Sequence, residues 1–143
     1  MSGYQELIEA AESDYRGDLF KEAHIKYGRA LSAGGECDYY CRKMRGICSR
    51  RVAEQRMDKA AERTEGSTAF LNQAAKWLAK SEANLDSALE NAPDTERGAI
   101  RLEQARTEET IAKFMEITGG DPQRRLTAAR AHREEGLTLQ SGR

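Results

Sequence analysis

Three cysteines lie within a short stretch in the first third of the chain. Cys37, Cys41 and Cys48 are spaced by four and seven residues, so a helix would place all three on one face. Such a face could hold a zinc ion, with His24 as a fourth ligand, or present a redox-sensitive thiol. Structural zinc sites use closely spaced cysteine pairs, and the chain has no Cys-x-x-Cys. We therefore expect no metal, and expect the cysteines to pack as small apolar residues, with a metal- or redox-responsive protein as an alternative.

A run of basic residues overlaps the cysteines. Its members are Arg42, Lys43, Arg45, Arg50 and Arg51. Segment 37–65 holds eight Lys or Arg against five Asp or Glu, whereas segment 1–36 holds four against seven. Opposite charges on adjacent segments favour a dipolar surface that orients a partner. Nucleic-acid binding would need a more sustained basic face, with aromatic or polar residues that could contact bases interleaved along it. Because five acidic residues occur in the same segment, we expect no nucleic-acid binding.

The titratable residues give no indication of catalysis. His24 and His132 belong to no nucleophile–base pattern, and no glycine-rich phosphate loop follows a strand. The pairs Glu108-Glu109 and Glu134-Glu135 are adjacent, so their side chains diverge by about 100° around a helix. We expect a protein that is not an enzyme and uses no cofactor.

The overall composition indicates which class of fold positions these residues. Of 143 residues, 33% are charged and 38% hydrophobic, with two prolines and a net charge of −1. Abundant Ala, Glu, Arg and Leu favour an all-α protein of one domain. No apolar run approaches the roughly 20 residues of a spanning helix. The N-terminus lacks the basic start and apolar body of a signal peptide. We therefore expect a cytoplasmic protein, with a nuclear location left open, that is neither secreted nor inserted in a membrane.

Glycine and proline divide the chain into six predicted helices. These cover about 5–15, 19–33, 38–65, 68–91, 95–118 and 122–135. Short connections make neighbouring helices antiparallel, which predicts αα-hairpins at about 4–33, 38–91 and 95–135. These hairpins form a single domain over 1–135, and 136–143 is predicted to be a flexible tail. Gly46 lies inside the third helix, where it indicates a kink or close packing.

The residue spacing of the first hairpin is typical of a packed repeat. In its second helix a small residue, an aromatic residue and an Ala-Leu pair follow one another at fixed intervals. The first helix and the start of the second contribute three more residues to the same pattern. The residues concerned are Leu7, Ala11, Phe20, Ala23, Tyr27, Ala30 and Leu31. On these residues, segment 4–37 resembles a tetratricopeptide repeat, a helix-turn-helix unit of about 34 residues. A second, partial match comprises Ser81, Leu85, Ala88, Leu89 and Pro93.

The resemblance implies antiparallel hairpins in a right-handed array, with a concave groove between the first helices that binds a peptide or helix of a partner. The two matches lie 58 residues apart, which is not a multiple of 34, and the third to fifth helices are longer than the family's. Chaperone-binding members clamp an acidic tail with Lys and Asn. The matching positions here are Ile8, Glu12 and Lys43, so we expect no binding of chaperone tails.

A second resemblance rests on the pattern Asp-x-x-Gly-x-x-Phe-x-x-Ala over residues 14–23. This pattern is similar to the start of microtubule-interacting-and-transport domains, three-helix modules that bind short helical peptides. The turn here is one residue longer than in that family, and the third-helix pattern is not reproduced.

These observations lead to one main hypothesis for the function. We expect a non-enzymatic adaptor or scaffold that binds another protein or peptide in a groove between its hairpins. The expected partner-binding residues are Tyr4, Glu12, Arg42, Lys43 and Arg45. The alternative is a structural or assembly subunit that forms homodimers through the long helices 38–65 and 68–91.

Overall fold

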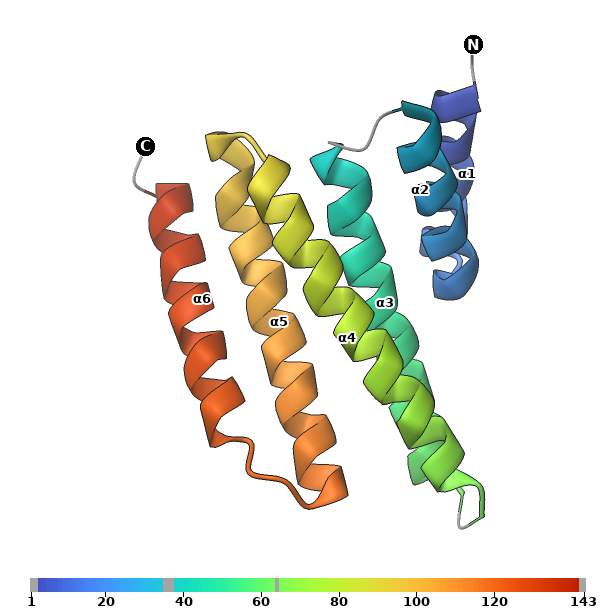
Figure 1. The fold of residues 1–143 in the computed structure, drawn as a ribbon, viewed down its shortest axis with the longest axis vertical. Helices are drawn as coiled ribbons and strands as arrows, with labels where there is room; N and C mark the ends of the chain where they lie inside the picture. The colour runs from blue at the N-terminus through green and yellow to red at the C-terminus, as the bar shows by residue number, and fades with distance from the viewer. Residues whose placement is uncertain (1–2, 35–37, 64, 142–143) are drawn as a thin grey trace.

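The computed structural model describes residues 3–34, 38–63 and 65–141 (Figure 1). These residues form an all-α protein of six helices, without any strand, which confirms the predicted fold class. The helices are α1 (Gly3–Arg16), α2 (Phe20–Gly34), α3 (Tyr39–Ala61), α4 (Ser67–Asn91), α5 (Asp94–Thr118) and α6 (Gln123–Ser141). No helix in the described part of the chain is both long and apolar enough to cross a membrane.

The helices pack as three successive hairpins, α1–α2, α3–α4 and α5–α6 (Figure 1). Helix α2 also packs on α3, and α4 on α5, so the hairpins stand side by side in chain order. As predicted, α3, α4 and α5 are long, with 23, 25 and 25 residues against 14 in α1 and 15 in α2. Their length leaves the α3–α4 hairpin projecting beyond the short first hairpin.

The residues that carry the predicted repeat pattern lie in helix interfaces. Those that are buried are Ala11, Phe20, Ala23, Tyr27, Ala30, Leu31, Leu85 and Ala88. Leu7 and Leu89 are half-buried, and Pro93 is the residue before α5. The small side chains let the helix backbones approach, and the aromatic rings fill the space between them.

Helix α3 is continuous through Gly46, so this glycine serves close packing. A Cβ at Gly46 would lie only 2.6 Å from Leu85 Cγ on α4. The Gly46 carbonyl accepts a hydrogen bond of 2.8 Å from Ser81 Oγ, and Ser81 in turn lies 2.9 Å from Thr107 Oγ1 on α5. These contacts join α3, α4 and α5 at one buried point.

The prediction of a flexible tail over 136–143 is wrong for 136–141, which extend α6 to Ser141. Gly136, which suggested a helix end, is buried against Gly98 of α5. A Cβ at Gly136 would lie 2.8 Å from the Gly98 carbonyl oxygen. The glycine therefore allows the two backbones to touch, and residues 142–143 lie outside the described part.

Candidate peptide-binding groove

The first helices of the three hairpins line a row of three adjoining hollows. The hollow next to α1 measures about 310 Å³, the middle one about 370 Å³ and the last about 330 Å³. Arg50 and Arg51 of α3 border both the first hollow and the middle one. Glu54 and Lys113 border both the middle hollow and the last. Because the hollows share these walls, they form one groove, which we call the α1/α3/α5 groove.

The middle of the α1/α3/α5 groove is positively charged. Four basic side chains and two carboxylates line it. The basic ones are Arg50, Arg51, Arg106 and Lys113, and the carboxylates are Glu54 and Glu109. Arg51 and Arg106 keep 46% and 58% of their side-chain surface exposed. The exposed Lys113 has no ion pair within the described residues. The groove therefore offers cationic groups to a bound molecule.

The carboxylates of the groove are engaged by neighbouring side chains. Arg51 reaches the Glu54 carboxylate at 3.3 Å, and Thr110 donates a hydrogen bond of 3.0 Å to it. Glu109 accepts from Arg133 of α6 at 2.5 Å. The acids are thus partly neutralised from within, and Lys113 keeps its full charge for a ligand.

Arg50 fixes the floor of the groove. Its side chain is only 8% exposed and binds Glu103 of α5 at 2.8 Å, with Glu54 at 3.7 Å. This pair holds α3 beside α5 where the two helices have few other contacts. Removing either partner of this largely buried pair would leave an uncompensated charge, so the pair helps to keep α3 and α5 together at the floor of the groove.

Core side chains border both ends of the groove, where Phe20 is 3% exposed and Met57 8% exposed. The Arg51 guanidinium lies 4.9 Å from the centroid of the Phe20 ring, which packs edge-on against Tyr15 at 5.4 Å. Met57 lines the opposite end. The core thus supports the groove from below, and the charged side chains along the groove suit an extended peptide segment of opposite charge.

Two of the predicted partner-binding residues have internal contacts. Tyr4 is half-buried, its hydroxyl lies 4.0 Å from Cys41 Sγ, and its ring occupies the space that a side chain at position 34 would need. Glu12 accepts a hydrogen bond from the Tyr40 hydroxyl. Burial and this bond raise the pKa of Tyr40 to about 12. Tyr4 and Glu12 therefore help to hold α1 on α3.

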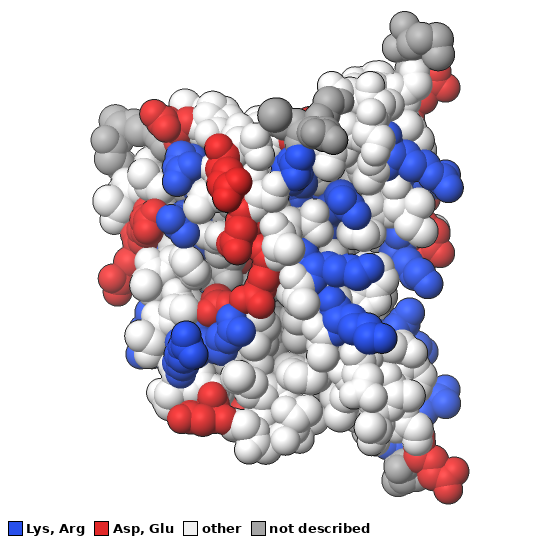
Figure 2. Space-filling model, viewed as in Figure 1, with Lys and Arg blue, Asp and Glu red and all other residues white. Residues whose placement is uncertain are grey.

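The three predicted basic residues lie on different sides of α3. Lys43 lies over the Tyr40 ring, with Nζ 5.4 Å from its centroid, and does not line the groove. Arg42 donates to Ser87 Oγ of α4 at 2.5 Å, and Arg45 lies over Gly28 of α2. Figure 2 shows Lys and Arg side chains on the α2–α3 side of α4, the face away from the groove.

The two cysteines in the described part of the chain, Cys41 and Cys48, are buried and protonated at neutral pH. Cys41 and Cys48 are fully buried, and burial raises the pKa of each thiol to about 12. Within the described residues no group of three potential metal ligands comes together. Cys37 lies outside the described residues. Two buried, protonated thiols pack as apolar groups and are poor metal ligands.

The histidine proposed beside the cysteines is also part of the packing. His24 packs edge-on against Trp77 of α4, with ring centroids 5.1 Å apart. Burial, with Arg45 and Lys80 nearby, lowers its pKa to about 4. A neutral imidazole is therefore buried between α2 and α4 at physiological pH.

Sequence reasoning missed the α5 side of the groove. Arg106 and Lys113 were not selected, because their sequence neighbours are a mixture of charges with no excess of either sign. They share the groove with Arg50 only through the packing of α5 beside α3. Comparison with protein-family models, characterised proteins and solved structures gave no significant match to this chain.

Proposed function

We propose that this chain is a non-enzymatic protein–protein interaction module that holds an acidic segment of a partner in the α1/α3/α5 groove. In this proposal the hairpins act as tetratricopeptide-like units, and their first helices form the binding surface. Arg51, Arg106 and Lys113 contact carboxylates of the bound segment.

The observation that carries the proposal is the charge around the middle hollow. Four cations and two carboxylates line it, and Glu103 behind them pairs with Arg50 and Arg106, which leaves an excess of one positive charge. The exposed guanidinium of Arg106 is bound on one side by Glu103 at 2.6 Å and keeps further donors free. Guanidinium groups bind carboxylates in a bidentate manner, and such contacts are stronger than neutral hydrogen bonds. An acidic peptide therefore complements this groove better than a basic or neutral one.

The chaperone-tail interaction is not part of the proposal. Ile8 is buried and Glu12 is hydrogen-bonded to Tyr40, so neither can bind a terminal carboxylate. The cationic groups lie further along the groove, on the middle of α3 and on α5. The proposed ligand is thus any acidic segment of the partner, whether it lies inside the partner chain or at its end.

The proposal is tested by charge reversal on the α5 wall. The double variant Arg106→Glu, Lys113→Glu is compared with the wild type in affinity capture from cells that express the protein, followed by mass spectrometry. We expect the acidic partners bound by the wild type to fall at least tenfold in the variant. Both positions are exposed, so the melting temperature should change little.

A matched control uses two exposed basic residues away from the groove. The double variant Lys76→Glu, Arg124→Glu makes the same change in net charge on α4 and α6. It should keep the partners of the wild type. Equal loss in both variants would mean that only net charge matters, and unchanged capture by the groove variant would refute the proposal.

A further inference from the structure

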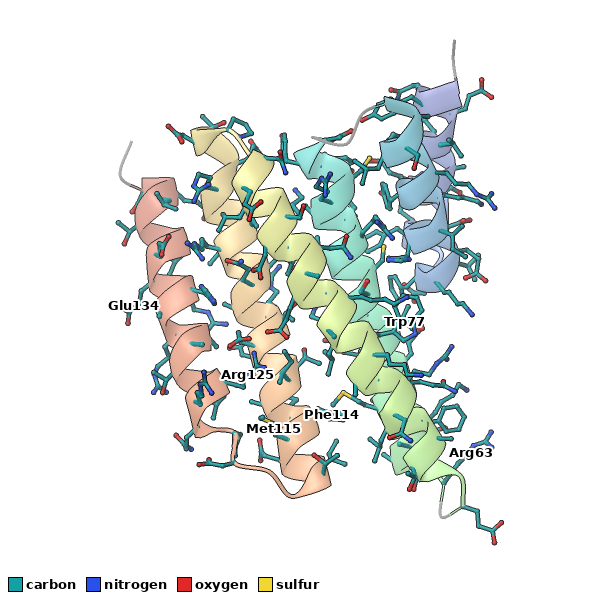
Figure 3. The ribbon with its side chains drawn as sticks, viewed as in Figure 1. Arg63, Trp77, Phe114, Met115, Arg125 and Glu134 are labelled. Atoms are coloured by element: carbon teal, nitrogen blue, oxygen red, sulfur yellow. The ribbon has the colours of Figure 1, made fainter. Side chains whose placement is uncertain are left out.

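A second groove lies on a different face of α5, where α4 and α5 diverge (Figure 1). It contains a hollow of about 180 Å³ with an apolar lining. Leu78 of α4 and Ile111 of α5 form its floor, with Phe114 and Met115 beside them. Figure 3 shows Phe114, Met115 and Arg125 around this opening, with Trp77 on the other side of α4. We call it the α4/α5 groove.

The apolar surface of this groove is left open by the crossing of the helices. Helix α4 meets α5 near its C-terminal half, where Gln104 donates to Asp86 at 2.9 Å. Toward its N-terminal end α4 packs mainly on α3, with Trp77 also meeting His24 of α2 and Leu78 sharing a core cluster with Ile111 of α5. Ala75 and Ala79 remain exposed on the α5 side. Small residues at this spacing leave room for another helix to approach α4 closely.

Acidic residues continue the same face of α4. Glu82, Asp86 and Glu90 follow Ala75 and Ala79 at steps of three and four residues, so all five lie along one side of the helix. Figure 2 shows the resulting row of Asp and Glu side chains where α4 borders α5. Asp86 and Glu90 are exposed at the surface. One side of α4 is thus apolar in its first half and acidic in its second.

The rim of the groove fixes how this charge is presented. Arg125 of α6 binds Glu82 at 2.6 Å and Glu108 at 2.7 Å. One guanidinium therefore balances only one of these two carboxylate charges, so the rim of the groove keeps a net negative charge. Asp86 and Glu90 make no ion pair within the described residues, so their charge is available to a ligand.

We propose that the α4/α5 groove docks a basic amphipathic helix of a partner protein. One large apolar side chain of that helix enters the hollow beside Phe114 and Met115, and its Lys or Arg residues pair with Asp86 and Glu90. The hollow is smaller than the roughly 300–1,000 Å³ of small-molecule sites, so it suits a side-chain anchor. Helices that bind in grooves use apolar anchor residues spaced by three and four positions. The face of α4 is apolar in its first half and acidic in its second, so it complements a helix that carries both apolar anchors and basic residues.

This inference does not depend on the proposed function. The α1/α3/α5 groove is cationic and the α4/α5 groove is acidic, so the two select opposite partners. One chain could then hold an acidic segment on one face and a basic helix on another.

The test uses a designed probe of 18 residues, helical, with Leu along one face and Lys on the others, labelled with a fluorophore. Its binding to the full-length protein is followed by fluorescence anisotropy. We expect saturable binding that falls at least tenfold in Ala79→Arg, which fills and charges the groove. In the double variant Asp86→Lys, Glu90→Lys we expect a loss of at least fivefold.

Two controls separate docking from general attraction of opposite charges. Ala131→Arg on α6 matches Ala79→Arg, and the double variant Glu9→Lys, Glu134→Lys matches the charge change of Asp86→Lys, Glu90→Lys. All three control sites are exposed, and each control variant should leave the affinity within twofold. A probe of the same composition without an apolar face should bind at least tenfold more weakly. Equal binding of both probes, or equal losses in groove and control variants, would overturn the proposal.

Discussion

The buried crossing of α3 and α4 at Gly46 allows a quantitative test of the fold. Replacing Gly46 by Ala would place a methyl group 2.6 Å from Leu85 Cγ and 2.8 Å from Leu85 Cδ2. Leu85 is completely buried, so its side chain cannot swing away into solvent. In a Leu85→Ala background the same substitution no longer meets the Leu85 side chain, and only the Ser81 carbonyl oxygen, at 3.3 Å, stays close to the new methyl group. The two substitutions therefore form a double-mutant cycle across one contact.

The expected magnitudes follow from the packing. Overpacking a filled core lowers the free energy of unfolding by about 1–3 kcal/mol. The higher helix propensity of Ala compared with Gly raises it by about 1 kcal/mol. Gly46→Ala alone should then lower the free energy of unfolding by up to about 2 kcal/mol. Leu85→Ala alone should lower it by about 2–5 kcal/mol, since it opens a cavity. In the Leu85→Ala background, Gly46→Ala should raise stability by about 1 kcal/mol.

Urea unfolding followed by circular dichroism measures all four proteins of this cycle. We expect a coupling energy of about 1–3 kcal/mol, with Gly46→Ala less harmful, or stabilising, when Leu85 is absent. If Gly46→Ala has the same effect in both backgrounds, within about 0.5 kcal/mol, the two residues are not in contact and the described crossing is wrong.

Three further predictions address the groove floor, the buried histidine and the thiols. Arg50→Met should lower the free energy of unfolding by about 2 kcal/mol. This is less than the loss expected when a fully buried ion pair is broken, because Arg106 also binds Glu103. Urea titration measures the change, and an unchanged midpoint would contradict a stabilising ion pair. The pKa of His24 is about 4 in the folded protein, against 6.5 in the unfolded chain. Between these values the unfolded state binds more protons, so the free energy of unfolding should fall by about 3 kcal/mol as the pH is lowered from 6.5 to 4. His24→Gln should flatten that part of the stability profile, and an equal slope in both proteins would refute the cause. Cys41 and Cys48 should resist alkylation by iodoacetamide at pH 8 until the protein is unfolded, as judged by peptide mass spectrometry, and rapid native labelling would contradict their burial.

Much of the helical framework follows from local sequence signals. Glycine and proline at the predicted breaks, with apolar residues at helical spacing between them, place the first five helices within four residues of their observed bounds. The sixth helix begins within one residue of its predicted start but ends six residues later than predicted, at Ser141. Gly136 misled the prediction because a glycine that ends a helix and a glycine that lets two helices touch look the same in the sequence. Only the position of Gly98 opposite it, 38 residues earlier, decides between the two.

The binding surfaces depend on contacts that one sequence does not show. The basic start of α3 was the strongest local charge feature, yet Arg42 and Arg45 contact α4 and α2, and Glu12 is held by Tyr40. The middle hollow instead joins Arg50 to residues of α5 more than fifty positions away. Such a cluster is created by the packing of α5 beside α3, for which the sequence carries no local signal.

Site-specific photo-crosslinking in living cells tests the central claim most directly. A photoreactive amino acid at position 113 lies in the middle of the α1/α3/α5 groove, and one at position 124 lies on α6 as the control. We predict a discrete adduct from position 113 only, and mass spectrometry should place the crosslink in an acidic segment of the partner. No adduct at position 113, or a crosslinked segment that is neutral or basic, would contradict the proposed function.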